Sequence, residues 1–132
     1  MKKFNFSILV CLSIYSLSSI AYTDSEIEKE LANEVKKQSL NLPIETNQVK
    51  IIAMYAGPGK VITYRVIIKG VVAKNLAPDW KVKRRALLKN QYCSDEAFKP
   101  FWRDNVAIAY ADFDSNGVSI LNTRITYSDC SK

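Results

Sequence analysis

One short segment carries the residues that look most like a site of chemistry. Asp112, Asp114 and Asn116 stand at alternating positions and are followed by Gly117. This spacing matches the first half of an EF-hand calcium loop, in which oxygen ligands at positions 1, 3 and 5 precede a glycine at position 6. The second half does not match, because Thr123 occupies position 12, where a bidentate glutamate belongs. No helical pattern flanks the segment either.

A tight turn between two β-strands explains the same residues in another way. An Asn-Gly pair favours a two-residue type I′ turn, because both central residues adopt positive φ. Pairing Ser115 with Val118 places the larger side chains of both strands on one face: Val106, Ile108, Tyr110, Thr123, Ile125 and Tyr127. We therefore predict a β-hairpin with Asn116 and Gly117 at its tip and no metal site. Weak cation binding by the two aspartates is the alternative.

The absence of histidine excludes several classes of catalytic and metal site. The chain contains no histidine, so the usual Ser-His-Asp and Cys-His nucleophile systems and histidine-bearing zinc or iron sites are excluded. The Gly-Pro-Gly-Lys sequence at 57–60 is similar to a phosphate-binding loop, but Met54 and Val61 stand where that motif needs Gly and Ser/Thr. Asp104 and the two aspartates above could supply carboxylates for glycoside hydrolysis, yet turn and cap roles account for all three. We predict no enzymatic activity and no cofactor.

Residues 1–21 have the organisation of a secretory signal peptide. Lys2 and Lys3 begin it, an apolar stretch follows, and Ser-Ile-Ala ends it with a small-x-small cleavage pattern, so that the mature chain would begin at Tyr22. Its five serines make this stretch a poor permanent membrane span, with a retained N-terminal anchor as the alternative. We predict export to the periplasm or the extracellular medium, with residues 22–132 forming a single domain.

The composition of the remaining chain fits this location. Cys93 and Cys130 are an even pair in an oxidising compartment, which predicts a disulfide; two free thiols are the alternative. Of 19 basic residues, two leave with the leader, so 17 basic and 13 acidic residues give a net charge of +4. This mild charge permits contact with an anionic surface, including a membrane surface, and does not indicate a nucleic-acid partner.

The spacing of hydrophobic residues predicts the helices and strands. Ser25 and Glu28 have capping-box spacing, and Ile27, Leu31 and Val35 form one apolar stripe of a helix that ends before Pro43. Two β-rich segments meet at 57–60, where pairing Gly57 with Lys60 gives one face of Ile51, Ala53, Tyr55, Ile62, Tyr64 and Val66. A Pro-Gly turn matches strand twist poorly, so this loop could exceed two residues.

A middle helix is expected from about 78 to 92. Trp80, Leu87, Leu88 and Gln91 fall on its apolar side, and Ser94 can cap a second short helix that Pro100 interrupts. That short helix carries an aromatic cluster, which is expected to cover the end of the sheet rather than bind a ligand: Phe98, Phe101 and Trp102. The last hairpin follows. The expected fold is α+β: an N-terminal helix on a curved, four-stranded antiparallel sheet with middle helices and one disulfide.

Basic residues recur on the middle helix with helical spacing. Lys81, Arg85 and Lys89 stand at i, i+4 and i+8, with Lys83 and Arg84 beside them. Such a stripe can bind anionic lipid, polysaccharide or an acidic protein, and the solvated face of an ordinary helix is the alternative. The candidate partner- or anion-binding residues are Lys81, Arg84, Arg85 and Lys89. The candidate contact loops contain Gly57, Pro58, Gly59 and Lys60, and Asn116 and Gly117.

Four segments, "YAGPGKVITYRV", "LLKNQYC", "VAIAYADFDSNG" and the terminal "SDC", resemble a family of small exported bacterial proteins of unassigned function. The resemblance covers about residues 42–130 and implies the two hairpins and the bond between Cys93 and Cys130. It implies no catalytic residue. The overall outline is similar to cystatin-like or NTF2-like rolls, an analogy of fold that does not determine function.

The sequence leads to three functional hypotheses. The first is a non-enzymatic periplasmic or secreted protein that binds another envelope protein. The second is an immunity protein or inhibitor that occludes a toxin or hydrolase with a loop at 56–60 or 115–117. The third is a basic surface that binds anionic lipid or polysaccharide.

Overall fold

The computed structural model describes residues 22–131, so the expected signal peptide lies outside the described residues. Within these residues three helices and five strands follow in the order α2 (Asp24–Ser39), β1 (Ile44–Glu45), β2 (Val49–Ala56), β3 (Val61–Ile68), α3 (Trp80–Ser94), α4 (Lys99–Asp104), β4 (Ala107–Phe113) and β5 (Ser119–Ile125). Three short 3₁₀ turns complete the order: η1 (Ala73–Asn75), η2 (Glu96–Phe98) and η3 (Tyr127–Ser131). Within the described residues, no helix combines the length and apolar character needed to cross a membrane.

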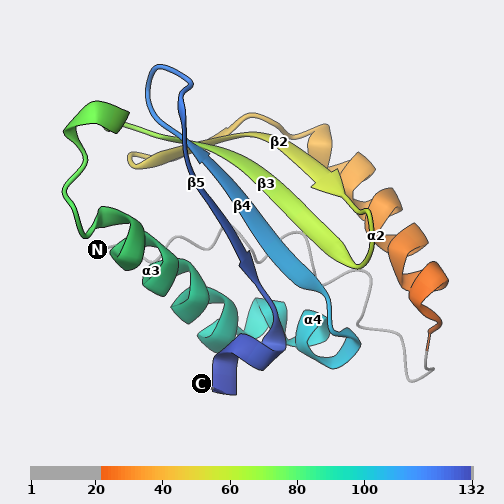
Figure 1. Cartoon of the computed structure of the whole chain (residues 1–132). Helices are drawn as coiled ribbons and strands as arrows, with labels where there is room; N and C mark the ends of the chain where they lie inside the picture. Colours follow the sequence, from red (N-terminus) through yellow and green to blue (C-terminus); the bar gives the residue numbers. More distant parts are fainter. Residues whose placement is uncertain (1–21, 132) are drawn as a thin grey trace.

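The sheet is mixed, which corrects the expectation of four antiparallel strands. Its order is β1-β2-β3-β4-β5, and the central pair β3–β4 is parallel, with Ile62 beside Ile108 and Tyr64 beside Tyr110 (Figure 1). Parallel neighbours need a crossover connection, and the segment containing α3 and α4 supplies it. This crossover returns the chain to the end of the sheet at which β3 starts. The short strand β1, which pairs with Lys50 and Ile51 of β2, was not predicted.

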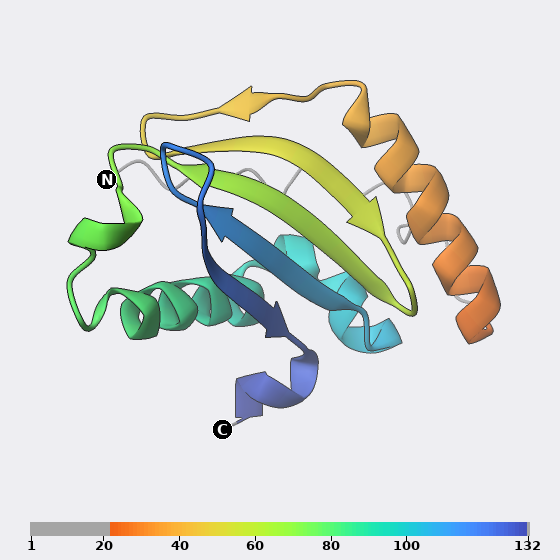
Figure 2. The same ribbon diagram turned by 45° about the horizontal axis from the view of Figure 1, so that its top comes forward.

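The helices cover one face of this sheet. Figure 2 shows α2 along the β2 side, and α3 and α4 below β4 and β5. The predicted stripe of α2 is confirmed as buried, with Ile27, Leu31 and Val35 exposed by only 4, 0 and 7%. It packs into a core with sheet and α3 side chains that include Met54, Ile62, Tyr64, Val66, Ile108, Ile125, Leu88 and Tyr92.

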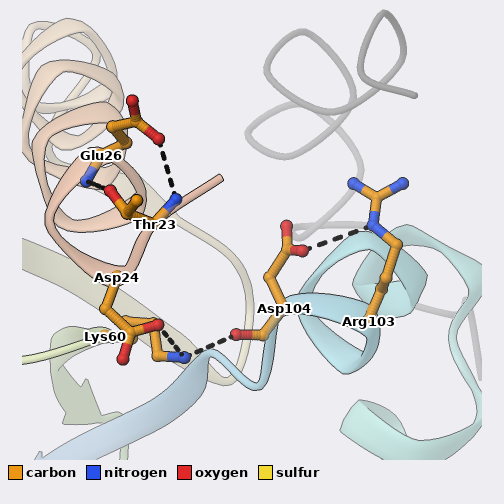
Figure 3. A network of polar contacts seen from close by, with 6 residues as sticks. All are labelled: Thr23, Asp24, Glu26, Lys60, Arg103 and Asp104. Carbon is orange, nitrogen blue, oxygen red and sulfur yellow. Dashed lines mark hydrogen bonds and ion pairs between the residues drawn. The ribbon is translucent and has the colours of Figure 1, made fainter. Parts of the chain in front are cut away.

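The N-cap of helix α2 lies two residues earlier than expected. Thr23, rather than Ser25, is the N-cap: its hydroxyl accepts a hydrogen bond from the Glu26 amide at 3.2 Å, and Glu26 accepts one from the Thr23 amide at 2.8 Å (Figure 3). This is the reciprocal pair of a capping box. The same two-residue shift makes Ser25 part of the first helical turn.

The β2–β3 hairpin has a register that differs by one residue from the predicted one. Tyr55 pairs with Thr63 and Met54 with Tyr64, so Met54 is buried and Tyr55 is 51% exposed. The cause is a loop one residue longer than a two-residue turn, closed by the Gly57 amide on the Val61 carbonyl at 2.8 Å. A bulge between Ile51 and Ala53 shifts the register back by one residue, so that Ile51 pairs with Val66 as predicted.

The β4–β5 hairpin has the predicted register but a different turn. Ile108 pairs with Ile125 and Tyr110 with Thr123, as expected. The loop is one residue longer, because the Asp114 amide bonds the Val118 carbonyl at 2.8 Å. Gly117 alone in this loop has positive φ, at 82°, whereas a type I′ turn needs two such residues. A three-residue loop whose glycine adopts the left-handed conformation also matches the right-handed twist of the two flanking strands.

Asp114 organises that loop from inside the protein. Its carboxylate is 1% exposed and accepts hydrogen bonds from the amides of Ala73 at 2.9 Å, Asn116 at 2.9 Å and Val118 at 2.8 Å. These donors, the Ala73 amide first, lower the pKa of Asp114 below its usual value. The bond to Ala73 also ties the hairpin tip to η1.

The lowered pKa predicts a specific dependence of stability on pH. A group whose pKa is lower in the folded than in the unfolded state stabilises the fold above its unfolded pKa, and this contribution is lost as the pH falls through the folded value. We expect Asp114→Asn to lower stability at pH 7 and to flatten the loss of stability below about pH 4. Urea unfolding midpoints from pH 7 to pH 2.5 measure this. The exposed control Glu28→Gln should follow the wild type, and an unchanged acid limb in Asp114→Asn would contradict the assignment.

Candidate binding surface on helix α3

Helix α3 is held against the sheet by one row of side chains. Trp80, Arg84, Leu88 and Tyr92 stand four residues apart and are buried or partly buried, as one face of a helix requires. The Tyr92 hydroxyl donates to the Val106 carbonyl at 2.8 Å. Burial, with the Asp129 carboxylate as a second cause, raises the pKa of Tyr92 above its usual range, so this hydroxyl stays protonated and donates.

Arg84 belongs to this inward row, which corrects its place among the candidate anion-binding residues. Its Nε donates to Oδ2 of Asp112 at 2.9 Å and its Nη2 to Oδ1 at 3.0 Å. Asp112 is fully buried on β4, and the Arg84 side chain is 13% exposed. A bidentate pair of this kind is specific in geometry as well as charge. Arg84 is therefore paired with a carboxylate inside the protein rather than free to bind an external anion.

The same contact changes the interpretation of the aspartate segment. Asp112 is committed to Arg84, and Asp114 to three backbone amides, so both carboxylates already have partners within the fold. Within residues 22–131, no three or more His, Cys, Asp or Glu side chains form a group that could hold a metal ion.

The outward face of α3 exposes apolar side chains. Val82 is 68% exposed and Leu87 is 51% exposed, with Ala86 exposed between them. Leu87 and Gln91 were expected on the buried side, but the inward row takes Leu88 and so turns both residues outward. Val82 and Leu87 point in directions about 140° apart around the helix, with Ala86 between them.

Ala86 and Leu87 border a groove beside the disulfide. An open depression of about 590 Å³ is lined by Lys83, Ala86, Leu87, Lys89, Asn90, Cys93 and Cys130. The predicted disulfide is confirmed, with a Cα–Cα distance of 5.4 Å, and it fastens η3 to the end of α3. We call the outward residues Val82, Ala86 and Leu87, together with this groove, the α3 surface.

Positive charge surrounds the α3 surface. Lys81 and Arg85 are exposed, and neither has a carboxylate partner among the described residues. Lys83 pairs with Asp79 at 2.7 Å, with 77% and 56% of the two side chains exposed, and such exposed pairs contribute little stability. The helix itself, from Trp80 to Ser94, contains no acidic residue. The surface therefore combines apolar contact area with uncompensated positive charge.

The two candidate loops do not form one site with each other. The β2–β3 loop precedes β3 and the β4–β5 loop follows β4, and these strands are parallel, so the loops lie at opposite ends of the sheet (Figure 1). Pro58 and Gly59 are exposed at one end, and Asn116 and Gly117 at the other.

Lys60, at the end of the first loop, forms polar contacts with two other elements of the fold. Its Nζ contacts Oδ1 of Asp24 at 2.9 Å and donates to the Asp104 carbonyl at 3.1 Å (Figure 3). This one side chain joins the start of α2 to the end of α4, so its role is structural.

The short helices differ from the predicted cap. Ser94 is the last residue of α3, and Asp95 caps the following turn by accepting from the Ala97 amide at 3.0 Å. Two residues of the aromatic cluster, Phe98 and Phe101, belong to the core at 3% and 0% exposed, and Trp102 packs against it partly buried. The Trp102 indole donates to the Tyr92 carbonyl at 2.9 Å, which further fixes the end of α3.

Comparisons with known proteins identify one distant sequence relative and several structures of similar fold. No family model matches the chain. A segment is 27% identical over 79 residues to Protein K of Escherichia coli, and the match covers 59% of this chain and 40% of that protein. The chain therefore spans well under half the length of this curated relative.

Three solved structures share the architecture. A crystal structure of a candidate secreted protein from Pseudomonas aeruginosa matches 84% of this chain and 98% of its own, with a TM-score of 0.68 and 14% identity. The pilotin EpsS from the Vibrio vulnificus type 2 secretion system matches 81% of this chain and 94% of its own, with a TM-score of 0.64 and 17% identity. The type II secretion pilotin AspS from Vibrio cholerae matches the same shares, with a TM-score of 0.63 and 16% identity. The chain thus shares its fold with a candidate secreted protein and two type II secretion pilotins.

Proposed function

We propose that this protein is a non-enzymatic component of the bacterial envelope that acts by binding another envelope protein through the α3 surface. The observation that carries the proposal is the pair of exposed apolar side chains on α3, Val82 at 68% and Leu87 at 51% exposed, with Leu87 lining a groove that also contains Lys83 and Lys89. In a chain without histidine, whose buried aspartates serve the fold, binding is the activity that these residues support.

The shared fold supports the same class of function. Two of the similar structures are pilotins of type II secretion systems, and one is a candidate secreted protein. At 14–17% identity this likeness concerns the fold, so the finer proposal, that the chain serves an envelope secretion assembly, depends on finding its partner. The expected export of the chain agrees with these neighbours.

The proposal predicts which substitutions abolish binding. We expect full-length tagged protein carrying Lys83→Glu and Leu87→Glu, two groove residues one helical turn apart, to lose at least about tenfold of its affinity for one envelope protein, because loss of an apolar contact and reversal of a nearby charge commonly cost about 2 kcal/mol or more. Quantitative mass spectrometry of material captured from envelope extract measures the loss.

A matched control separates this effect from a general change of charge. Lys29→Glu with Lys36→Glu alters two exposed lysines on α2 and should leave capture unchanged. Circular dichroism confirms that each variant is folded. Capture that survives the α3 changes and disappears with the α2 changes would place the binding site elsewhere.

A further inference from the structure

We propose that the sheet face opposite the helices binds an acidic polysaccharide through Arg65 and Arg124. This inference goes beyond the proposed function, because the α3 surface lies on the helical side of the sheet and both surfaces can be occupied at once. It rests on the register of the strands, the charge of this face, the way in which Arg65 is held and the kinds of side chain around it.

The strand register defines which residues form this face. Tyr64 and Ile108 belong to the core between the sheet and the helices, so their neighbours along β3 and β4 point to the other side. Paired residues form three rows that cross this side from β2 to β5, and each of these residues is at least partly exposed. The rows are Tyr55, Thr63, Ala109 and Arg124; Ala53, Arg65, Ala111 and Asn122; and Lys50, Ile67, Phe113 and Ser119. We call the residues of these three rows the open sheet face.

The open sheet face carries an excess of positive charge. It contains Lys50, Arg65 and Arg124 and no acidic residue. Arg65 and Arg124 have no carboxylate partner among the described residues. Glu45 of β1 stands beside Lys50 at one corner, but it is already paired with Lys69. The face therefore attracts anions.

The spacing of these cations suits a polymer with repeated acidic groups. Because strands lie about 4.8 Å apart and rise about 3.3 Å per residue, the register places the Cα atoms of Lys50 and Arg65 about 8 Å apart and those of Arg65 and Arg124 about 12 Å apart. Between the two arginines, β4 presents the short side chains of Ala109 and Ala111. A chain that lies across these alanines can contact more than one cation at a time, which raises its apparent affinity.

Arg65 is held in place before a ligand arrives. Its guanidinium carbon lies 4.4 Å from the centre of the Phe113 ring, which is a cation–π contact. The planar guanidinium keeps its N–H donors for a carboxylate while it rests on the ring. A side chain that is ordered in advance loses less conformational entropy on binding.

The other side chains favour a polysaccharide over a membrane or a protein. Thr63, Ser119 and Asn122 supply hydroxyl and amide groups that can hydrogen-bond sugar hydroxyls, and Tyr55 adds an aromatic ring that is 51% exposed. Peripheral membrane contact needs apolar side chains that enter the bilayer, and the core of a protein interface is apolar and depleted of charge. The middle row instead holds Arg65 between two alanines. The face thus matches a hydrated, acidic chain.

Alginate oligosaccharide, a polymer of uronic acids, is the probe for the full-length protein, and a neutral dextran oligosaccharide is its control. We expect labelled alginate to bind, measured by fluorescence anisotropy, with an affinity that falls as ionic strength rises, and dextran not to bind. Arg65→Glu with Arg124→Glu should weaken alginate binding at least about tenfold. Lys81→Glu with Arg85→Glu makes the same change of net charge at exposed positions of α3 and should leave the affinity within about twofold, because salt screens distant charges.

A substitution that leaves the charge unchanged separates contact from long-range attraction. Ala109→Gln with Ala111→Gln places two longer neutral side chains between the arginines and should also weaken alginate binding. Amide chemical-shift changes in the wild type should centre on Thr63, Arg65 and Asn122. Circular dichroism confirms that each variant is folded; if the glutamate variant is not, Arg65→Gln with Arg124→Gln takes its place and should lose affinity in the same direction.

Several results would overturn this inference. They are an absence of alginate binding, an equal loss in the sheet and α3 variants, and chemical-shift changes centred on α3. Vesicles containing phosphatidylglycerol and soluble poly-glutamate provide two further arms: binding to either that requires Arg65 and Arg124, without binding of alginate, would assign the face to anionic lipid or to acidic polypeptide instead. The proposed function is tested separately, by Lys83→Glu with Leu87→Glu, and does not depend on these results.

Discussion

Arg84→Ala is expected to lower the free energy of unfolding by about 3–5 kcal/mol, because it removes one partner of a buried ion pair and leaves the other charge uncompensated. Asp112 is fully buried and both of its carboxylate oxygens accept from Arg84, at 2.9 and 3.0 Å. Urea unfolding at pH 7 measures the change. In a domain of ordinary stability, a loss of this size approaches unfolding.

The neighbouring arginine supplies a matched control. Arg85 is exposed and has no ion-pair partner among the described residues, so Arg85→Ala should change stability by no more than about 0.5 kcal/mol. If Arg84→Ala leaves no folded protein to measure, the double variant Arg84→Met with Asp112→Leu should recover folding, because a buried pair can be replaced by apolar residues. Equal effects of the Arg84 and Arg85 single variants would contradict the inward assignment of Arg84.

Removal of the disulfide is the second change with a large expected effect. Cys93 and Cys130 are 37 residues apart in the sequence, and the chain-entropy model gives about 4 kcal/mol for closing a loop of this length. We expect Cys93→Ala with Cys130→Ala to reduce the free energy of unfolding by about this amount, measured by urea unfolding of the purified protein.

Reductant provides the control for this second prediction. Dithiothreitol should destabilise the wild type by a similar amount and leave the double alanine variant unchanged. Because the bond joins α3 to the C-terminal turn, hydrogen exchange should increase first in η3 and in the last turn of α3. A wild type whose unfolding is insensitive to reductant would contradict the stabilising role of this bond.

Local patterns in the sequence predict those parts of the fold that local physics determines. The apolar period of Ile27, Leu31 and Val35 predicts the buried face of α2, and the Asn116–Gly117 tip predicts the register of β4 with β5. The cysteine pair predicts the disulfide. In each case the residues that decide the outcome are close in sequence, or, for the cysteines, can combine in only one way.

The central parallel pair could not be predicted in the same way. Both hairpins are locally antiparallel, and no residue pattern within either one shows how the two associate. Their association depends on the path of the crossover through α3, which is a property of the tertiary packing. The one-residue loop extension between β2 and β3 has a similar effect, because it moves Met54 inward and Tyr55 outward without changing the composition of either strand.

The candidate site shows the same limit. Charge alone groups Arg84 with Lys81, Arg85 and Lys89, because its buried partner is 28 residues away on another element. The signal that distinguishes them is the four-residue row from Trp80 through Arg84 and Leu88 to Tyr92. Once that row is taken as the inward face, Val82 and Ala86 must face outward, and this apolar part of the α3 surface could have been found from the sequence, whereas the exposure of Leu87 could not.

Site-specific photo-crosslinking in intact cells tests the central claim, that α3 carries the binding surface, most directly. A photoreactive phenylalanine analogue placed at Leu87 is predicted to form one abundant adduct with an envelope protein, and the same analogue at Asn122, exposed on β5, is predicted to form none. An adduct at 122 or at the loop positions 59 or 116, with none at 87, would contradict the account.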